Sequence, residues 1–194
     1  IQAARNKYPH IKFLCTDFED IQKKYDSVIC SNVLEHLENY LHYIEKMCLI
    51  AKRYVIIMVP YKDCSGEPSH INYFDEKSFP VQIKDFCLVY EKVIDTSEIE
   101  NTYWKGQQKL FVYEKCGKRG IKMDNKLVPL VETWDKVAET YKIEIENSEQ
   151  EIADAIALQL EKIGIYPGAS LVELGCGSGH LSACLAQKGY KTAL

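Results

Sequence analysis

Residues 171–180 read LVELGCGSGH, and this stretch decides the fold. An apolar run ends at Leu174, and Gly175, Gly177 and Gly179 follow before a helical pattern begins. Glycine has no Cβ, so it adopts positive φ and lets the backbone approach a ligand closely. A helix N-terminus behind such a loop offers free N–H groups to polar or negative atoms. We therefore expect a nucleotide-type ligand here; the alternative is a tight turn from strand to helix.

The spacing of the glycines narrows the class of nucleotide. The dinucleotide fingerprint G-x-G-x-x-G requires its third glycine where this chain has His180 or Ser182. Glu173 instead stands two residues before the first glycine, which makes the pattern E-x-G-x-G-x-G. A carboxylate at a strand tip would repel a pyrophosphate and suits a ligand that carries an ammonium group. A nicotinamide-dependent oxidoreductase is therefore disfavoured.

This pattern resembles the first motif of the class I S-adenosylmethionine-dependent methyltransferases. The resemblance implies an α/β, Rossmann-like fold with a mostly parallel sheet of order 3-2-1-4-5-7-6, one antiparallel strand and helices on both faces. It also implies S-adenosyl-L-methionine as the cofactor. Glu173 would lie near the cofactor's amino group, and the loop would be lined by Gly175, Cys176, Gly177 and Gly179. The segment LSACLAQKGYKTAL that follows, a helix of small residues leading into a strand, strengthens the resemblance.

Apolar runs alternate with helical patterns along the chain, which favours an α/β fold. Buried parallel strands are expected at Lys12–Thr16, Ser27–Ser31, Tyr54–Val59 and Ser170–Leu174. The segments Cys87–Ile94 and Lys109–Tyr113 are expected to pair antiparallel, and a last strand starts at Tyr190. Helices are expected over Asn39–Lys52, from the capping-box pair Ser148 and Glu151, and near His180–Lys188.

The N-terminal part resembles the later part of the same domain. In FLCTDFEDI, Asp17 matches the position that accepts from the adenine amino group, and Phe18 flanks the ring. A solvated acidic turn is the alternative for this segment. YDSVICSNVLEHLENY resembles the fourth motif in the form typical of the type 11, ubiquinone-biosynthesis-like group. There Ser31 and Asn32 stand at the tip of a strand, where cofactors bind in open α/β sheets.

Two histidines are candidate catalytic residues. His36 follows the fourth motif and is expected to act as a general base, because the pKa of imidazole lies near neutrality; a structural role is the alternative. His70 lies in VPYKDCSGEPSHINYFDEKSF, which resembles a segment of methyltransferases that accompany sugar and glycan biosynthesis. It would lie over the acceptor pocket, or else cap a helix or remain on the surface. Some quinone-pathway relatives bind a divalent metal here, but Asn32 replaces their first glutamate, so no metal is expected.

The order of these motifs is inverted with respect to the family. Residues 127–194 resemble the front of a methyltransferase domain, residues 1–116 resemble the remainder, and residues 117–126 read as a linker. The chain is either a slice from tandem domains, which its two ends favour, or a circular permutant. Closure of one domain within a chain and segment exchange in a homodimer are both feasible. We expect Ile1 and Leu194 to lie close together beside the cofactor pocket.

The amino-acid composition and charge argue against several classes of partner and against disulfides. Against 28 acidic residues the chain has 24 Lys and Arg, and the net charge of -4 predicts no nucleic acid partner. No apolar run is long enough to span a membrane, so no membrane partner is expected. The eight cysteines form no CxxC pair and mostly lie in apolar runs, which predicts reduced thiols in a cytoplasmic protein rather than disulfides.

The sequence thus predicts S-adenosyl-L-methionine-dependent methyl transfer to an oxygen or nitrogen atom of a small-molecule acceptor, with sugars and glycan precursors as examples. The alternative is a non-catalytic methyltransferase-like module or an incomplete fragment, because the family's ribose-binding acid is missing.

Overall fold

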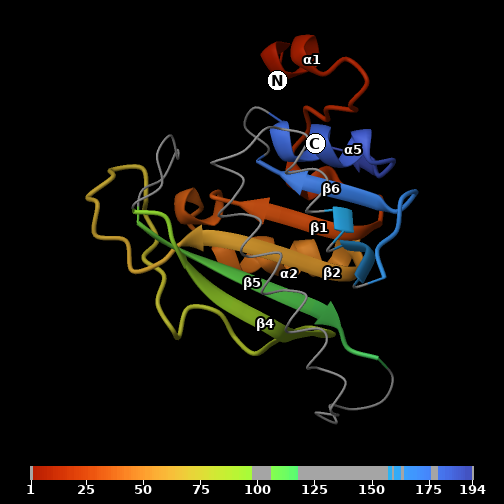
Figure 1. Cartoon of the computed structure of the whole chain (residues 1–194). Coiled ribbons are helices and arrows are strands. Elements are labelled where there is room, and N and C mark those ends of the chain that lie inside the picture. The colour runs from red at the N-terminus through yellow and green to blue at the C-terminus, as the bar shows by residue number, and fades with distance from the viewer. Residues whose placement is uncertain are drawn as a thin grey trace.

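The computed structural model describes residues 2–97, 106–117, 157–158, 160–162, 164–175 and 179–193. These residues build one mixed sheet of seven strands in the order β3-β4-β5-β2-β1-β6-β7 (Figure 1). The strands are β1 (Tyr25–Ser31), β2 (Ala51–Pro60), β3 (Gln82–Ile83), β4 (Phe86–Asp95), β5 (Gln107–Lys115), β6 (Ser170–Leu174) and β7 (Lys191–Ala193). The helices are α1 (Gln2–Lys7), α2 (Tyr40–Ile50) and α5 (His180–Gln187), with single 3-10 turns η1 (Phe18–Asp20) and η2 (Leu34–His36).

The first and last parts of the chain pair with each other inside this sheet. β6 pairs in parallel with β1 on one side, Val28 opposite Val172, and with β7 on the other. In Figure 1 the blue strand β6 lies beside the orange-red strand β1. The four central residues of β1 are all buried, as expected of a strand with neighbours on both sides and apolar layers on both faces.

Alternating residues of β2 divide the core into two layers on opposite faces of the sheet. Val55 and Ile57 pack in one layer with Ile44 and Met47 of α2. Tyr54 and Ile56 pack in the other, which includes Leu181 and Leu185 of α5. Helices therefore cover both faces, as the sequence predicted.

Three details of the sheet differ from the prediction. In place of the strand expected at Lys12–Thr16, the described residues show one parallel bridge between Lys12 and Ala193 of β7. The opposite edge carries an additional two-residue strand, β3. The sheet is also not mostly parallel: among the described strands, β1/β2, β1/β6 and β6/β7 are parallel, whereas β2/β5, β4/β5 and β3/β4 are antiparallel. The expected antiparallel pairing of the segments at 87–94 and 109–113 is confirmed.

Polar contacts also join the two parts of the chain. The Asp26 carboxylate accepts hydrogen bonds from the backbone N–H and the hydroxyl of Ser170, at 2.6 Å and 2.8 Å. Lys52 forms an ion pair with the same carboxylate at 3.0 Å. The Arg53 guanidinium donates to the Gly164 carbonyl at 3.0 Å. These bonds fix the start of β6 against the start of β1.

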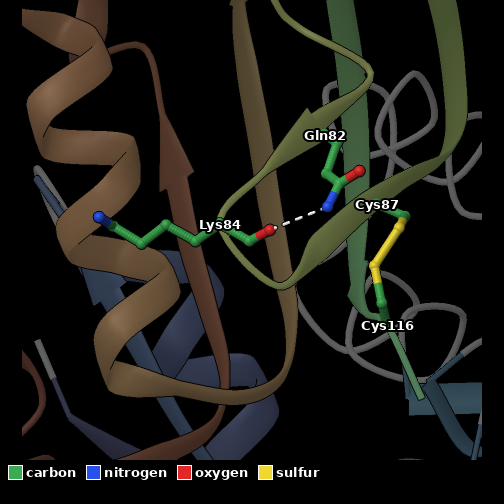
Figure 2. Close-up of a disulfide and its surroundings, with 4 residues drawn as sticks. All are labelled: Gln82, Lys84, Cys87 and Cys116. Atoms are coloured by element: carbon green, nitrogen blue, oxygen red, sulfur yellow. Dashed lines mark hydrogen bonds between the residues drawn. A yellow bond between two sulfur atoms is a disulfide. The ribbon is translucent and has the colours of Figure 1, made fainter. Parts of the chain in front are cut away.

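The prediction of reduced cysteines is wrong for one pair. Cys87 and Cys116 form a disulfide between the start of β4 and the end of β5 (Figure 2). Phe86 and Lys115 are paired in the antiparallel β4/β5 ladder, so Cys87 and Cys116 lie diagonally across this pair, with Cα atoms 5.9 Å apart. The sequence separation of 29 residues does not predict this disulfide, because the register of the β4/β5 hairpin decides which cysteines meet. Among the described residues, the cysteines outside this disulfide are Cys15, Cys30, Cys48, Cys64 and Cys184.

Some sequence predictions fall on residues outside the described part. They include the helix from Ser148 and Glu151, most of the 117–126 linker, and the positions of Ile1 and Leu194. The domain boundaries therefore stay predictions. Within the described segments, no helix combines the length and the apolar character that crossing a membrane requires.

Candidate functional site

A cavity of about 230 Å³ lies where β1 and β6 end. Both parts of the chain contribute to its wall: residues 14–47 line it together with residues of β6 and the start of the glycine loop. The lining residues are Leu14, Thr16, Phe18, Ile21, Cys30, Val33, Leu37, Tyr43, Met47, Val172, Glu173, Leu174 and Gly175. The wall is apolar apart from a few polar groups, which is the usual character of a small-molecule site.

Glu173 is the carboxylate in this wall. The residue is only 8% exposed, and its Oε2 accepts a hydrogen bond from the Ser182 hydroxyl at 2.7 Å. Burial raises the pKa of this carboxyl to about 7, although the hydrogen bonds from Ser182 oppose the shift. A cationic group in the cavity would favour the ionised form, so Glu173 is suited to bind an ammonium group.

Gly175, the first glycine of the motif, packs directly against the segment that follows β1. Gly175 has a φ of +67°, and a Cβ built on it would clash with Cγ2 of Val33. A side chain at this position is therefore excluded both by the backbone conformation and by space. Gly179, with a φ of +75°, is the N-cap of α5. The predicted loop residues Cys176 and Gly177 lie outside the described part.

The acidic segment contributes one of its two predicted residues to the cavity. Phe18 lines it and stacks on Tyr43, with ring centroids 6.0 Å apart and an interplanar angle of 17°. Asp17 is exposed and does not line the cavity; its carboxylate caps η1 by accepting from the Glu19 N–H at 2.9 Å. An adenine contact by Asp17 therefore stays a prediction.

Ser31 and Asn32 lie at the tip of β1 and do not line the cavity either. Asn32 adopts a φ of +51° and donates its backbone N–H to the Met58 carbonyl at 2.9 Å. Its Nδ2 donates to the Ser31 hydroxyl at 3.3 Å. These contacts show Asn32 as the residue that turns the chain away from the sheet after β1.

The two predicted histidines lie next to each other although 34 positions separate them in the sequence. The ring centroids of His36 and His70 are 5.0 Å apart. The segment after β2 brings His70 there, because the Glu35 carbonyl accepts from the N–H groups of Ile71 and Asn72 at 2.9 Å and 3.1 Å. The Asn72 side chain also donates to the carbonyls of Leu34 and Leu37, at 2.8 Å and 2.6 Å. Neither histidine lines the cavity.

Two carboxylates accompany these histidines. Glu35 is 1% exposed, and burial raises the pKa of its carboxyl. The Asp63 Oδ2 lies 2.7 Å from Nδ1 of His70. Burial alone would raise the pKa of Asp63, but hydrogen bonds from Ser65 and His70 outweigh it and lower that pKa. Asp63 is therefore ionised at neutral pH and accepts the His70 N–H.

Sequence reasoning missed most of the apolar wall. Tyr43 and Met47 line the cavity from α2, four residues apart on one side of the helix. The sequence predicted a helix over Asn39–Lys52 and assigned neither of these two residues to a site. The available signal was an aromatic residue and a methionine four positions apart on a helix. The same pair is also common in hydrophobic cores without a binding site.

Comparisons with known proteins give the fold. No protein-family model and no curated protein matches the chain. Among solved structures it is similar to TTHA0409 ("Putative DNA Modification Methylase") from Thermus thermophilus in complex with S-adenosyl-L-methionine. The identity is 12%, the TM-score is 0.50, and the match covers 94% of this chain and 86% of that one. A complex of M1.HpyAVI with S-adenosyl-L-methionine aligns at 14% identity and a TM-score of 0.48, over 94% and 90% of the two chains. The chain has the class I S-adenosylmethionine-dependent methyltransferase fold.

This result corrects the prediction on partners. The acidic net charge was expected to exclude nucleic acid, but the fold is shared with a protein described as a DNA modification methylase. Net charge sums over the whole surface and does not describe the local charge at a binding face. It therefore gives no ground for excluding nucleic acid.

Proposed function

We propose that this protein binds S-adenosyl-L-methionine in the cavity lined by Glu173 and Gly175 and transfers its methyl group to an oxygen or nitrogen atom. The observation that carries the proposal is the placement of Glu173. The motif E-x-G-x-G-x-G predicts a carboxylate for an ammonium group, and Glu173 is a buried carboxylate in an apolar wall at that place.

The residues of the cavity fit the parts of this cofactor. Glu173 offers charge to the amino group, and Gly175 lines the same wall with the side chain of Val33 packed against it. Phe18, stacked on Tyr43, offers an aromatic surface to the adenine ring. The cofactor supplies an activated methyl group on a sulfonium ion. The protein has to align the acceptor, exclude water and accept a proton from it, and His36 is the candidate for the last role.

The acceptor divides into two classes that an experiment separates. The sequence predicted a small molecule, such as a sugar or glycan precursor, and the comparisons lend that prediction no support. TTHA0409 is described as a DNA modification methylase, which makes DNA the second acceptor to test.

Calorimetric titration of the full chain with S-adenosyl-L-methionine tests the binding. We expect one site, at least tenfold weaker binding for Glu173→Gln, and unchanged binding for Glu38→Gln, which removes an exposed carboxylate. Because ionised Glu173 attracts the cation, binding should strengthen from pH 6 to pH 8. No binding at millimolar cofactor would contradict the proposal.

Labelled cofactor then tests the transfer. The protein is incubated with methyl-labelled S-adenosyl-L-methionine and either unmethylated DNA or a small-molecule extract of cells. Label in one fraction identifies the acceptor class. Binding without transfer to either fraction would instead support a non-catalytic module.

A further inference from the structure

We propose that Asp63 and His70 are positioning residues: they hold the Ser69 carbonyl against Nδ1 of His36 and so fix His36 in the tautomer that can take a proton from the methyl acceptor. The inference deepens the proposed function and rests on it, because proton acceptance by His36 is part of that proposal. It adds a set of contacts outside the cofactor cavity, since none of Asp63, Ser69 and His70 lines that cavity.

The hydrogen bond to Ser69 decides which ring nitrogen of His36 carries the proton. The Ser69 carbonyl oxygen lies 2.8 Å from Nδ1 of His36. A carbonyl oxygen can only accept, so Nδ1 carries the proton and the lone pair of the neutral ring is on Nε2. Oε1 of Glu35 lies 3.8 Å from this Nε2, which is beyond hydrogen-bond distance. The side chain of His36 is 40% exposed, so an acceptor can reach the ring.

The peptide bond between Ser69 and His70 is held in place by its neighbours. Its carbonyl oxygen is coplanar with the His70 N–H, and that N–H donates to the Glu67 carbonyl at 3.0 Å. The N–H and the hydroxyl of Ser69 both donate to Oε1 of Glu67, at 3.2 Å and 3.0 Å. On the other side, the Ile71 N–H donates to the Glu35 carbonyl at 2.9 Å. The direction of the Ser69 carbonyl therefore depends on the conformation of this loop.

The Asp63 carboxylate closes the loop of residues 63–70. Its Oδ2 accepts from Nδ1 of His70 at 2.7 Å, and its Oδ1 accepts from the Ser65 N–H at 2.8 Å. The side chains of Asp63 and His70 are only 9% and 10% exposed, so water competes little for their hydrogen bond. Burial would raise the pKa of Asp63, but the hydrogen bonds from Ser65 and His70 lower it overall. Asp63 therefore offers one acceptor oxygen to each end of the loop.

The His70 ring also packs against the ring that it positions. The ring centroids of His36 and His70 are 5.0 Å apart, and the rings meet edge to face at an interplanar angle of 65°. Because Asp63 fixes the His70 ring, this contact restricts the orientation of His36, as the hydrogen bond to Ser69 does. A third group that orients the base is the usual arrangement behind a catalytic histidine. Here the orienting carboxylate acts one step further away, through the backbone next to His70.

Nitrogen NMR of the full chain reads the tautomer directly and needs no cofactor. At pH 8, above the ordinary imidazole pKa of about 6.5, long-range proton–nitrogen correlation distinguishes a protonated ring nitrogen from an unprotonated one. We expect the proton of wild-type His36 predominantly on Nδ1, and His36→Gln identifies its signals. Asp63→Asn should give a mixture of both tautomers, because an amide has one acceptor oxygen where Ser65 and His70 each need one.

A second variant and a control guard against a general folding defect. His70→Phe keeps a ring beside His36 and removes the donor to Asp63, so it should give the same mixture of tautomers. Glu19→Ala removes the carboxylate that lies 2.8 Å from Nε2 of the exposed His42, and it should change the tautomer of His42 alone. A proton on Nε2 of His36 in the wild type, or on Nδ1 in both variants as before, would overturn the proposal.

Methyl-transfer kinetics then test whether Asp63 acts through His36. We expect Asp63→Asn to lower kcat about 10-fold and to leave cofactor affinity unchanged. In the His36→Gln background the same substitution should lower kcat no further, because residues that act as a unit are not additive. Additive losses would contradict the positioning role. Absence of transfer by the wild type would contradict the proposed function, whereas the NMR result decides the present inference without it.

Discussion

At the scale of single residues, burial makes Glu173 a titrating group near neutral pH. Its carboxyl has a pKa of about 7 in the folded chain, against an ordinary value of 4.5. The folded state therefore retains a proton between these values that the unfolded state has lost. Stability from this group is present at low pH and is lost as the pH rises towards and through 7.

Glu173→Gln should remove this pH dependence. We expect the free energy of unfolding of the wild type to fall by about 2 kcal/mol relative to the variant between pH 5 and pH 8, since one pKa unit corresponds to about 1.4 kcal/mol. Denaturant unfolding of both proteins at several pH values measures the difference. Parallel pH profiles would show that Glu173 is ionised throughout.

Gly175→Ala should destabilise the folded chain and distort the cavity wall that Gly175 forms with Val33. Its Cβ would be strained by a φ of +67° and would clash with Val33. We expect a loss of about 2–4 kcal/mol, the sum of left-handed strain and overpacking. Gly66→Ala is the matched control, because Gly66 has a φ of +73° with open space around it and should show the strain alone. Val33→Ala, introduced together with Gly175→Ala, should recover part of the lost stability. If the two substitutions change the free energy of unfolding additively, the contact between the two residues is contradicted.

At the scale of elements, the β4/β5 hairpin is held at one end by the disulfide of Cys87 and Cys116. Beside it, Gln82 Nε2 donates to the Lys84 carbonyl at 3.1 Å in the turn between β3 and β4 (Figure 2). β4 has β5 as its neighbour on one side and only the two-residue β3 on the other. A covalent bond to β5 therefore limits fraying of the strand near the sheet edge.

Cys87→Ser should lower the free energy of unfolding by about 2–4 kcal/mol, because the disulfide closes a loop of 29 residues in the unfolded chain. Denaturant unfolding with and without a reductant gives the value. Reductant should destabilise the wild type and leave the variant unchanged, whereas Cys64→Ser, which removes an exposed free thiol, should behave as the wild type. An equal response of all three proteins would show that the bond does not form in solution.

At the scale of the whole molecule, β6 from the C-terminal part of the chain lies between β7 and β1, and β1 comes from the N-terminal part. The cavity exists only where these parts meet, since Val33 and Gly175 close against each other there. We expect the described strands to unfold in one cooperative transition, because β1 would lose its neighbour on one side without β6.

Asp26→Ala tests this coupling, because it removes the hydrogen bonds to Ser170 across 144 residues of sequence. Hydrogen bonds to a charged group contribute about 1.5–3 kcal/mol, and solvent screening of this half-buried carboxylate reduces the expected loss to about 1–2 kcal/mol. Lys52→Ala removes only the exposed ion pair with Asp26 and should cost less than about 1 kcal/mol. Unfolding followed by circular dichroism should remain a single transition in both variants.

A strand could be predicted where the hydrophobic pattern of the segment and its neighbours in the sheet lead to the same position. β1, β2 and β6 are short apolar runs that can only be buried in the middle of a sheet, and all three were expected within a few residues. The segment Lys12–Thr16 had a similar pattern and forms only one bridge, to Ala193 of β7. Periodicity reports the burial of a segment and not the length of the neighbour it pairs with.

The site was predictable in part, for the same reason. Glu173, Gly175 and Phe18 line the cavity, since they belong to motifs that are contiguous in sequence. Ser31 and Asn32 were assigned to the cofactor by their place at a strand tip. Asn32 turns the backbone at this tip, and the cofactor role of both residues stays a prediction. The direction in which a strand-tip side chain points depends on φ, which the motif does not contain.

The sequence by itself predicted the class of fold and a positively charged ligand group beside Glu173. Both predictions follow from residues that are adjacent in the chain. Only the tertiary structure decided which distant groups meet. It joined Cys87 to Cys116, closed Gly175 against Val33, and brought His70 beside Glu35 and His36. Contacts of this kind arise from strand register and loop packing, which are properties of the folded backbone and leave no periodic trace in the order of the residues.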